Sequence, residues 1–396
     1  MRAPNPGRVR LILAIAGCAA AGLAASSGAG CGDDPPASRP STDASFDAPS
    51  TIDSGADTSV TPRGERVLGL AVPIGDLAFA QDLQAARDAG VRATNVSLAW
   101  DEIEQPYDAG APDAADDAAP KAQLFNASLH VADLVLSEYQ TKALLAVSAV
   151  DVGGSRAPAE LATRPLDDAE LGARYDKVTD YVLRSTPDLD IAALFVGTDV
   201  DVALGDDETQ HAAFATFLAR AAAHARAVKP GLKVGFTVTS EGIESKGARL
   251  TAAWAAADVI GVTYLPIDAA AHVRLPSDVA KDLDRIVAAA PPGKPIVLRE
   301  AAYPRSAVCG SSDAAQAAFV SAVFRAWDRH AERMPFLTFR ELDDASDEAV
   351  TALAARQRRT DPPFLAFLGS LGLRTADARK KQGFDALVRE ARARGF

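Results

Sequence analysis

The strongest constraint on the fold is a repeated alternation of short β-rich segments with longer segments of helical periodicity. Eight strand-like segments are recognisable, at residues 66–72, 94–100, 143–150, 191–197, 232–239, 259–264, 295–300 and 336–342. Segments with a helical spacing of apolar residues lie between several of them, at residues 79–89, 169–183, 208–228 and 314–333. This alternation predicts a parallel α/β sheet, and eight strands favour a closed (β/α)8 TIM barrel over an open, doubly wound sheet.

Composition and motifs argue against several classes of function. Hydrophobic residues make up 48% of the 396-residue chain and charged residues 24%, which is ordinary for a globular protein. The formal net charge of -12 disfavours contact with phosphate backbones, so no nucleic-acid partner is expected. No Gly-x-Gly-x-x-Gly motif follows the first strand and no Gly-Lys-Ser/Thr loop occurs, which argues against a nucleotide-binding sheet.

Cysteines and histidines are too few and too scattered for a disulfide scaffold or a zinc site. The chain has three cysteines and five histidines, without a Cys-x-x-Cys or a His-Glu-x-x-His motif. We therefore expect no metal and no organic cofactor.

Residues 1–31 have the layout of a bacterial export signal. Arg2, Arg8 and Arg10 precede a stretch, residues 11–30, that carries no charge. Two cysteines follow sequences that resemble a lipobox, and we favour Cys31 over Cys18 as the lipidated residue because a polar segment follows it. The alternatives are plain secretion and a retained transmembrane helix. The expected location is the bacterial cell envelope, with a lipid anchor in the membrane.

The next segment predicts a tether rather than a domain. Residues 32–64 consist mainly of Pro, Ser, Thr, Asp and Gly and contain almost no large apolar side chain. Such a stretch cannot bury enough apolar surface to offset its chain entropy, so disorder is expected. No comparable linker follows, which predicts a single domain over residues 65–396.

Acidic residues stand at the ends of several predicted strands. Glu300 ends the seventh strand and Asp199 follows the fourth; other strand-end acids are Asp101, Glu104, Asp151 and Glu341. In a barrel of this type the loops after the strands share one rim, and chemistry takes place there. Two carboxyl groups that face one another across this rim are the minimum for hydrolysis of a glycosidic bond. This predicts a polysaccharide or oligosaccharide partner, and Trp100 and Tyr264 offer flat faces for sugar rings.

The strand-end motifs resemble those of the large clan of retaining (β/α)8 glycoside hydrolases that includes endo-β-1,4-galactanases and cellulases. In that clan Gly-Asn-Glu usually follows the fourth strand, and the seventh strand ends in a Glu that often precedes Gly-Tyr-Pro or Gly-Trp-Pro. Here residues 197–199 read Gly-Thr-Asp and residues 300–304 read Glu-Ala-Ala-Tyr-Pro. The resemblance implies that Glu300 is the nucleophile and Asp199 the acid/base.

The same resemblance implies a set of substrate-binding residues. Residues 262–266 read Val-Thr-Tyr-Leu-Pro, and in the clan a Tyr near this point often contacts the nucleophile. Residues 100–104 read Trp-Asp-Glu-Ile-Glu and resemble the usual Trp-x-x-Ile-Glu-Pro turn. The expected set comprises Trp100, Thr198, Tyr264, Tyr303 and Glu341.

Three departures from the clan's pattern keep a second function open. Thr198 and Asp199 replace the usual Asn and Glu, and the shorter Asp sets its carboxyl back by about 1 Å, a displacement that can be costly for catalysis. Where the clan presents a Trp after the eighth strand, this chain offers only Phe339. The alternatives are a degenerate barrel that binds polysaccharide or an envelope partner without catalysis, and a purely structural surface lipoprotein.

Each candidate residue also has a purely structural interpretation. Glu300 could pair with a neighbouring arginine, and Asp199 could cap the helix that begins near Glu208. Tyr264 could be a core residue and Trp100 a rim-packing residue. Glu341 could form a surface pair with Arg340. Cys309 has no histidine nearby in sequence and is expected to be a buried, inert thiol, and the following Ser311-Ser312-Asp313 run predicts a helix cap.

Overall fold

A closed barrel of eight parallel strands forms the centre of the computed structural model, which describes residues 60–75, 78–106 and 122–396. Around the barrel the strands follow the order β1, β12, β11, β10, β9, β8, β5, β2. The strands are β1 (Val67–Leu70), β2 (Ala93–Ala99), β5 (Lys142–Ser148), β8 (Ile191–Phe195), β9 (Val234–Thr239), β10 (Val259–Tyr264), β11 (Ile296–Ala301) and β12 (Phe336–Phe339). The predicted (β/α)8 barrel is thereby confirmed, and each of these strands overlaps one predicted segment.

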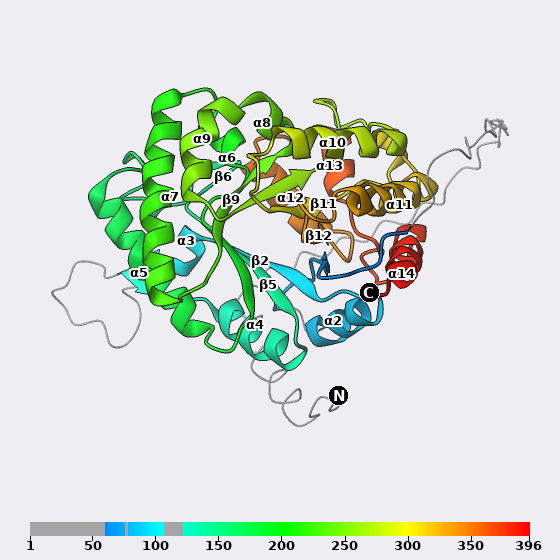
Figure 1. The fold of residues 1–396 in the computed structure, drawn as a ribbon, viewed down its shortest axis with the longest axis horizontal. Coiled ribbons are helices and arrows are strands. Elements are labelled where there is room, and N and C mark those ends of the chain that lie inside the picture. Colours follow the sequence, from blue (N-terminus) through cyan, green and yellow to red (C-terminus); the bar gives the residue numbers. More distant parts are fainter. Residues whose placement is uncertain (1–59, 76–77, 107–121) are drawn as a thin grey trace, which may run out of the picture.

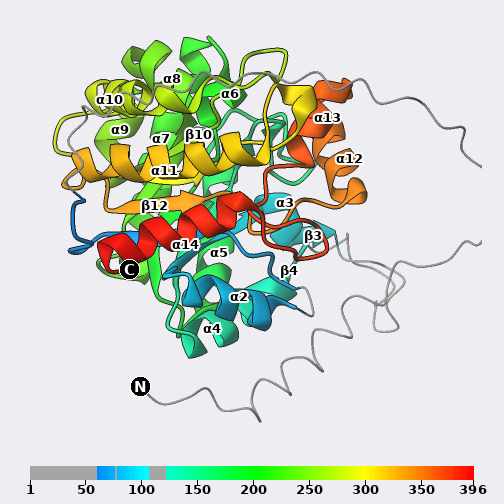
Figure 2. The ribbon, with the colours of Figure 1, turned by 90° about the vertical axis from the view of Figure 1, so that its right-hand side faces the viewer.

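A helix on the outside of the barrel follows each of these strands (Figure 1). The helices are α2 (Phe79–Asp88), α4 (Ala127–Glu138), α5 (Ala169–Ser185), α7 (Glu208–Val228), α9 (Gly247–Ala256), α10 (Val279–Ala289), α11 (Asp313–Arg329) and α14 (Gln382–Arg394). The sequence predicted α2, α5, α7 and α11. The last helix, α14, lies beside α11 (Figure 2) and brings the end of the chain back to β1, where the backbone N–H of Arg63 donates to the carbonyl of Arg394.

Side-chain caps explain where several helices begin. Asp168 and Asp207 accept hydrogen bonds from backbone N–H groups in the first turns of α5 and α7. Ser312 caps α11 in the same way, as the Ser-Ser-Asp run predicted. Since Asp207 caps α7, Asp199 does not perform that role.

Apolar packing differs inside and outside the barrel. The interior holds a small cluster made of Leu144, Ala146, Ala193, Phe195, Val259 and Val297. A much larger cluster fills the layer between the strands and the helices. Close packing explains Gly261, because a Cβ atom at that position would lie 2.9 Å from the ring of Phe195.

Short elements gather at the end of the barrel where the strands end. They are α3 (Trp100–Ile103), α6 (Val200–Leu204), α8 (Ser240–Ser245), α12 (Asp347–Arg356), α13 (Pro362–Leu368), two 3-10 turns (Pro276–Asp278 and Ala307–Cys309), and the hairpins β3 (Glu104–Pro106) with β4 (Ala122–Leu124) and β6 (Val150–Asp151) with β7 (Gly154–Ser155). Residues 107–121, between β3 and β4, lie outside the described residues.

The predicted export signal and most of the predicted tether also lie outside the described residues, and so do Cys18 and Cys31. Within the part of the chain that the structure describes, no helix combines the length and the apolar character that a bilayer crossing needs. Cys309 is buried and unpaired, as expected for a structural thiol.

Candidate active site

A β-bulge in β11 places Arg299 and Glu300 together at the barrel mouth. The pairing of β10 with β11 runs in step up to Val262 and Leu298 and then shifts, so that Thr263 pairs with Glu300. Arg299 is the extra residue. A bulge of this kind bends the strand and redirects side chains, and bulges are common beside active sites.

Two arginines hold both carboxylate oxygens of Glu300. Arg299 donates to Oε1 at 2.9 Å and Arg340, directly after β12, donates to Oε2 at 2.5 Å. Arg299 is itself fully buried: it donates to Oγ of Ser97 at 2.5 Å and lies 5.5 Å from the ring centroid of Phe195. Burial alone would raise the pKa of Glu300, but the charges of Arg340 and Arg299 outweigh burial, so the pKa lies below its ordinary value.

Asp199 occupies a strained turn after β8. Its backbone has a φ of 47°, in the left-handed region that Asp tolerates better than most residues. Two strand-end hydroxyls fix its side chain, because Thr263 donates to Oδ1 at 2.7 Å and Thr237 donates to the same atom at 3.3 Å. Asp199 also occupies the position before α6, but its side chain accepts no capping hydrogen bond there.

The environment of Asp199 favours its protonated form. Burial, followed by the nearby charge of Glu300, raises the pKa of Asp199 to about 7. The hydrogen bond from Thr263 acts in the opposite direction and is too weak to cancel these effects. Of these two residues, Glu300 is therefore ionised at neutral pH, whereas Asp199 is protonated in a large fraction of molecules.

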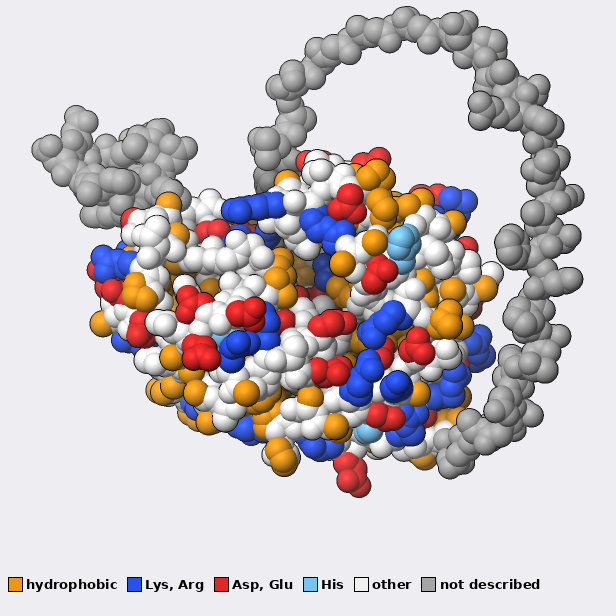
Figure 3. All heavy atoms as spheres, turned by 90° about the horizontal axis from the view of Figure 1, so that it is seen from above, with side chains coloured by type: hydrophobic (Ala, Val, Ile, Leu, Met, Phe, Trp, Pro, Cys, Tyr) orange, Lys and Arg blue, Asp and Glu red, His pale blue; other side chains and the backbone are white. Residues whose placement is uncertain are grey.

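Two adjoining cavities open at this mouth. The larger has a volume of about 660 Å³ and is lined by residues of β2, by residues that follow β1 and β12, and by Glu300. The smaller, of about 220 Å³, is lined by both Asp199 and Glu300. Figure 3 shows a side of the barrel, where acidic and basic side chains are interspersed over the surface.

Of the predicted substrate-binding residues, Thr198 and Glu341 lie at the mouth. Thr198 lines the smaller cavity, and its hydroxyl lies 2.7 Å from that of Ser148. Glu341 lines the larger cavity and accepts a hydrogen bond from Arg340 at 3.1 Å, the pair that the alternative interpretation expected. Burial raises the pKa of Glu341 above its ordinary value.

Trp100 does not offer a face to a sugar, contrary to expectation. Its side chain is 0% exposed: Nε1 donates to Glu104 at 2.7 Å, and the ring packs edge-on against Tyr175 at 5.2 Å. The short helix α3 turns the ring beneath the rim, which makes Trp100 a packing residue.

Tyr264 and Tyr303 are also absent from the mouth, which corrects two further predictions. Both are buried, and both stack on Phe319 of α11 on the outside of the barrel. Their hydroxyls donate to Asp282 and to the carbonyl of Arg274, each within 2.8 Å. Phe339 is buried as well, so it cannot replace the missing platform.

Replacement of Trp100 by Ala is expected to reduce stability rather than to affect ligand binding alone. Removal of a fully buried Trp costs about 3–5 kcal/mol in proteins. The free energy of unfolding in urea is therefore expected to fall by that amount. A sugar-binding role would predict the reverse: unchanged stability and weaker saccharide binding.

Sequence reasoning missed the groups that control the two carboxyls. The sequence suggests only that Glu300 could pair with a neighbouring arginine, and nothing in it singles out Arg299, Thr237 or Thr263. The only available signal was position, since all three lie in the last part of a strand. Among the described residues, no group of three or more His, Cys, Asp or Glu side chains is arranged to hold a metal ion.

No family model matches the sequence, and no curated protein matches it in sequence. Several solved structures that share this fold are glycoside hydrolases. GH5_18 from Bifidobacterium longum subsp. longum, solved in complex with Manb1-4GlcNAc, aligns with a TM-score of 0.62 at 13% identity over 83% of this chain and 78% of that chain. The exo-beta-1,4-mannosidase Op5Man5 from Opitutaceae bacterium strain TAV5 aligns with a TM-score of 0.59 at 16% identity over 83% and 59%.

A GH10 xylanase from Thermobacillus composti aligns with a TM-score of 0.52 at 15% identity, over 83% of this chain and 98% of that chain. At these identities the likeness shows a shared fold. The fold implied by the resemblance of the strand-end motifs to glycoside hydrolases is therefore confirmed.

Proposed function

We propose that this chain hydrolyses a glycosidic bond in an oligosaccharide or polysaccharide by a retaining mechanism. One observation carries the proposal: two carboxyl groups line the same cavity, and their surroundings move their pKa values in opposite directions. In glycoside hydrolysis, a carboxyl group with a raised pKa acts as the acid, and a nearby carboxylate that stays ionised acts as the nucleophile. The shared fold with glycoside hydrolases supports the same assignment.

In the first step Glu300 attacks the anomeric carbon of the substrate. Its carboxylate forms a bond to that carbon while the bond to the leaving-group oxygen breaks, and protonated Asp199 transfers its proton to that oxygen. The leaving group departs as an alcohol, and a glycosyl ester on Glu300 results. Arg299 and Arg340 keep the carboxylate ionised and oriented before the attack.

In the second step water replaces the enzyme on the sugar. Asp199, now ionised, takes a proton from water while the water oxygen attacks the anomeric carbon and the ester bond to Glu300 breaks. Two inversions leave the configuration of the sugar unchanged, and both carboxyl groups return to their starting protonation states.

The product's anomeric configuration tests this mechanism. A panel of 4-nitrophenyl glycosides identifies the preferred sugar, and β-mannosides come first because two of the solved structures name mannose-containing ligands or activity. Proton NMR of the first-formed product is expected to show the substrate's own configuration. Release of the opposite anomer would contradict a covalent intermediate on Glu300.

A second candidate function is saccharide binding without turnover. Among the described residues that line the two cavities none is aromatic, so the stacking platforms typical of sugar sites are missing there. Both oxygens of Glu300 are also engaged by arginines. Binding of a glycan that persists in Glu300→Gln, together with the absence of product from every glycoside of the panel, would select this candidate.

We also propose that the protein is exported and lipid-anchored in the bacterial envelope. The arginines before the uncharged segment and the two cysteines support this proposal. Incorporation of a labelled fatty acid is expected to be lost in Cys31→Ser and retained in Cys18→Ser. The opposite pattern would move the anchor to Cys18, and incorporation in neither parent nor variants would exclude an anchor.

A further inference from the structure

Helix α12 crosses the mouth of the barrel from one side to the other. The helix follows β12 in the chain, and its apolar side chains pack against segments that follow β10 and β11. Its last residue, Arg356, contacts segments that follow β2 and β5. In the order of the barrel these two pairs of strands lie opposite one another. The α12 segment is thus a strap over the site rather than part of its wall.

The strap has its own apolar anchor on the β10–β11 side. Val350 and Ala354 of α12 pack with Phe364, Phe367 and Leu368 of α13. This cluster also contains Ala271, Ala302, Cys309 and Leu371, and it is separate from the main core. Cys309 is fully buried beneath α13, with its Sγ 3.6 Å from the carbonyl of Pro363.

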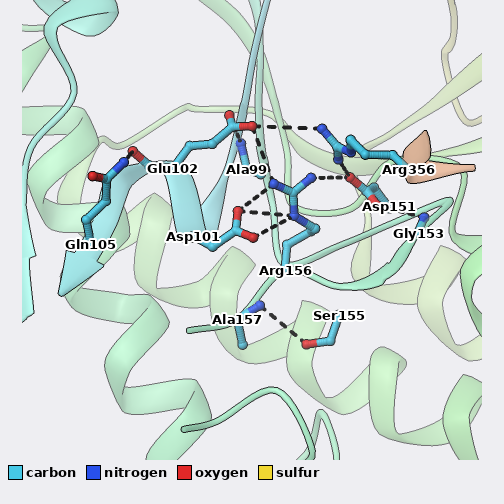
Figure 4. A network of polar contacts seen from close by, with 10 residues as sticks. All are labelled: Ala99, Asp101, Glu102, Gln105, Asp151, Gly153, Ser155, Arg156, Ala157 and Arg356. Atoms are coloured by element: carbon cyan, nitrogen blue, oxygen red, sulfur yellow. Dashed lines mark hydrogen bonds and ion pairs between the residues drawn. The ribbon is translucent and has the colours of Figure 1, made fainter. Parts of the chain in front are cut away.

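An ion-pair network fastens the opposite end of the strap (Figure 4). Arg356, the last residue of α12, donates to Asp151 and lies 3.9 Å from Glu102. Arg156 donates to the same Asp151 oxygen at 2.7 Å and to Asp101 at 2.6 Å. The network joins α12 to two separate loops of the far rim.

Leu353 of the strap lines both cavities, so the strap lies between the two openings. Ser97, Leu98, Glu300 and Arg340 are likewise shared by both, which means that the openings meet at the nucleophile. Asp199 lines only the smaller cavity. Because the acid must face the departing oxygen, the leaving group belongs in the cavity of about 220 Å³ and the glycon in the cavity of about 660 Å³.

We propose that the α12 strap, closed by Arg356, restricts the substrate to short oligosaccharides or chain ends with a small leaving group. This inference rests on the proposed function. The leaving-group cavity is below the size range of about 300–1,000 Å³ typical of drug-sized ligands, and the charged network that includes Arg356 bounds it. A continuous polysaccharide lying across the mouth would meet Leu353 and Arg356 of the strap.

Cys309 provides a native reporter of the strap that does not depend on catalysis. In full-length protein with Cys18→Ser and Cys31→Ser, Cys309 is the only thiol, and an aromatic disulfide reagent can reach it only when the α12–α13 cluster opens. Arg356→Ala is expected to speed its labelling about fivefold, the effect of removing a partly exposed ion pair. Arg358→Ala, which removes an exposed arginine outside the network, is the matched control and is expected to label like the parent.

Kinetics with two probes test the consequence for the substrate. The ratio of kcat/KM for β-1,4-mannan to that for 4-nitrophenyl β-mannoside is expected to rise at least about fivefold in Arg356→Ala and to stay constant in Arg358→Ala. Equal labelling of Cys309 in both variants, or an unchanged ratio, would overturn the inference. If the parent cleaves no glycoside while labelling of Cys309 still depends on Arg356, the result contradicts the proposed hydrolysis but supports the closure of the strap by Arg356.

Discussion

Glu300→Gln is expected to lower kcat/KM for the best aryl glycoside by at least about a thousandfold, because the amide cannot act as the nucleophile. The protein should still fold, since Gln keeps the size of the side chain and can accept a hydrogen bond from one of the two arginines. Circular dichroism and initial rates measure the two properties separately.

The matched control for this variant is Glu332→Gln, which replaces an exposed glutamate just before β12. Its rate should equal that of the parent protein. A Glu300→Gln variant that keeps more than a tenth of the parent activity would rule out Glu300 as the nucleophile.

Asp199→Asn is expected to lower kcat/KM by about 10²- to 10⁴-fold and to remove the alkaline limb of the pH profile. The active form has Asp199 protonated and Glu300 ionised. As the pH rises through about 7, Asp199 loses its proton, so activity of the parent protein should fall tenfold per pH unit above that value. On the acid side, activity should fall only below the ordinary range of a glutamate, because the pKa of Glu300 is lowered.

Asp190→Asn is the matched control, because it removes an exposed carboxyl just before β8, at the other end of the same strand. Its pH profile should match that of the parent. A profile of the parent that stays flat between pH 6 and pH 9, with rates unaffected by Asp199→Asn, would exclude Asp199 as the acid.

The barrel could be predicted from sequence because its signals are local. The strands are short and apolar, and segments with helical periodicity lie between several of them; such patterns do not depend on distant contacts. The convergence of Asp199 and Glu300 followed from the fold itself, since all strands of a parallel barrel end at one rim. Both residues do line one cavity.

The sequence misplaces Tyr264 because the direction of a strand side chain depends on its phase. Successive residues of a strand point to opposite faces. Thr263 points to the mouth, where it donates to Asp199, so its neighbour Tyr264 points outward to α10 and α11. A motif of a few residues does not fix this phase, and the bulge at Arg299 shifts it again within β11.

The strap was not predicted because its position depends on long-range contacts. Apolar residues between Val350 and Leu371 form a separate cluster with loops that follow β10 and β11. Arg356 contacts Asp151, which is 205 residues away along the chain. No local pattern encodes such a pairing. The same holds for Arg340 with Glu300, which are 40 residues apart.

Titration of the Asp199 carboxyl by carbon-13 NMR tests the central claim most directly and needs no substrate. Comparison with Asp199→Asn assigns the signal. We expect a pKa of about 7 for Asp199 in the parent protein and a clearly lower pKa in Glu300→Gln, where the neighbouring negative charge is gone. A pKa near the ordinary aspartate value, unchanged by Glu300→Gln, would contradict an interacting pair of carboxyl groups at the barrel mouth.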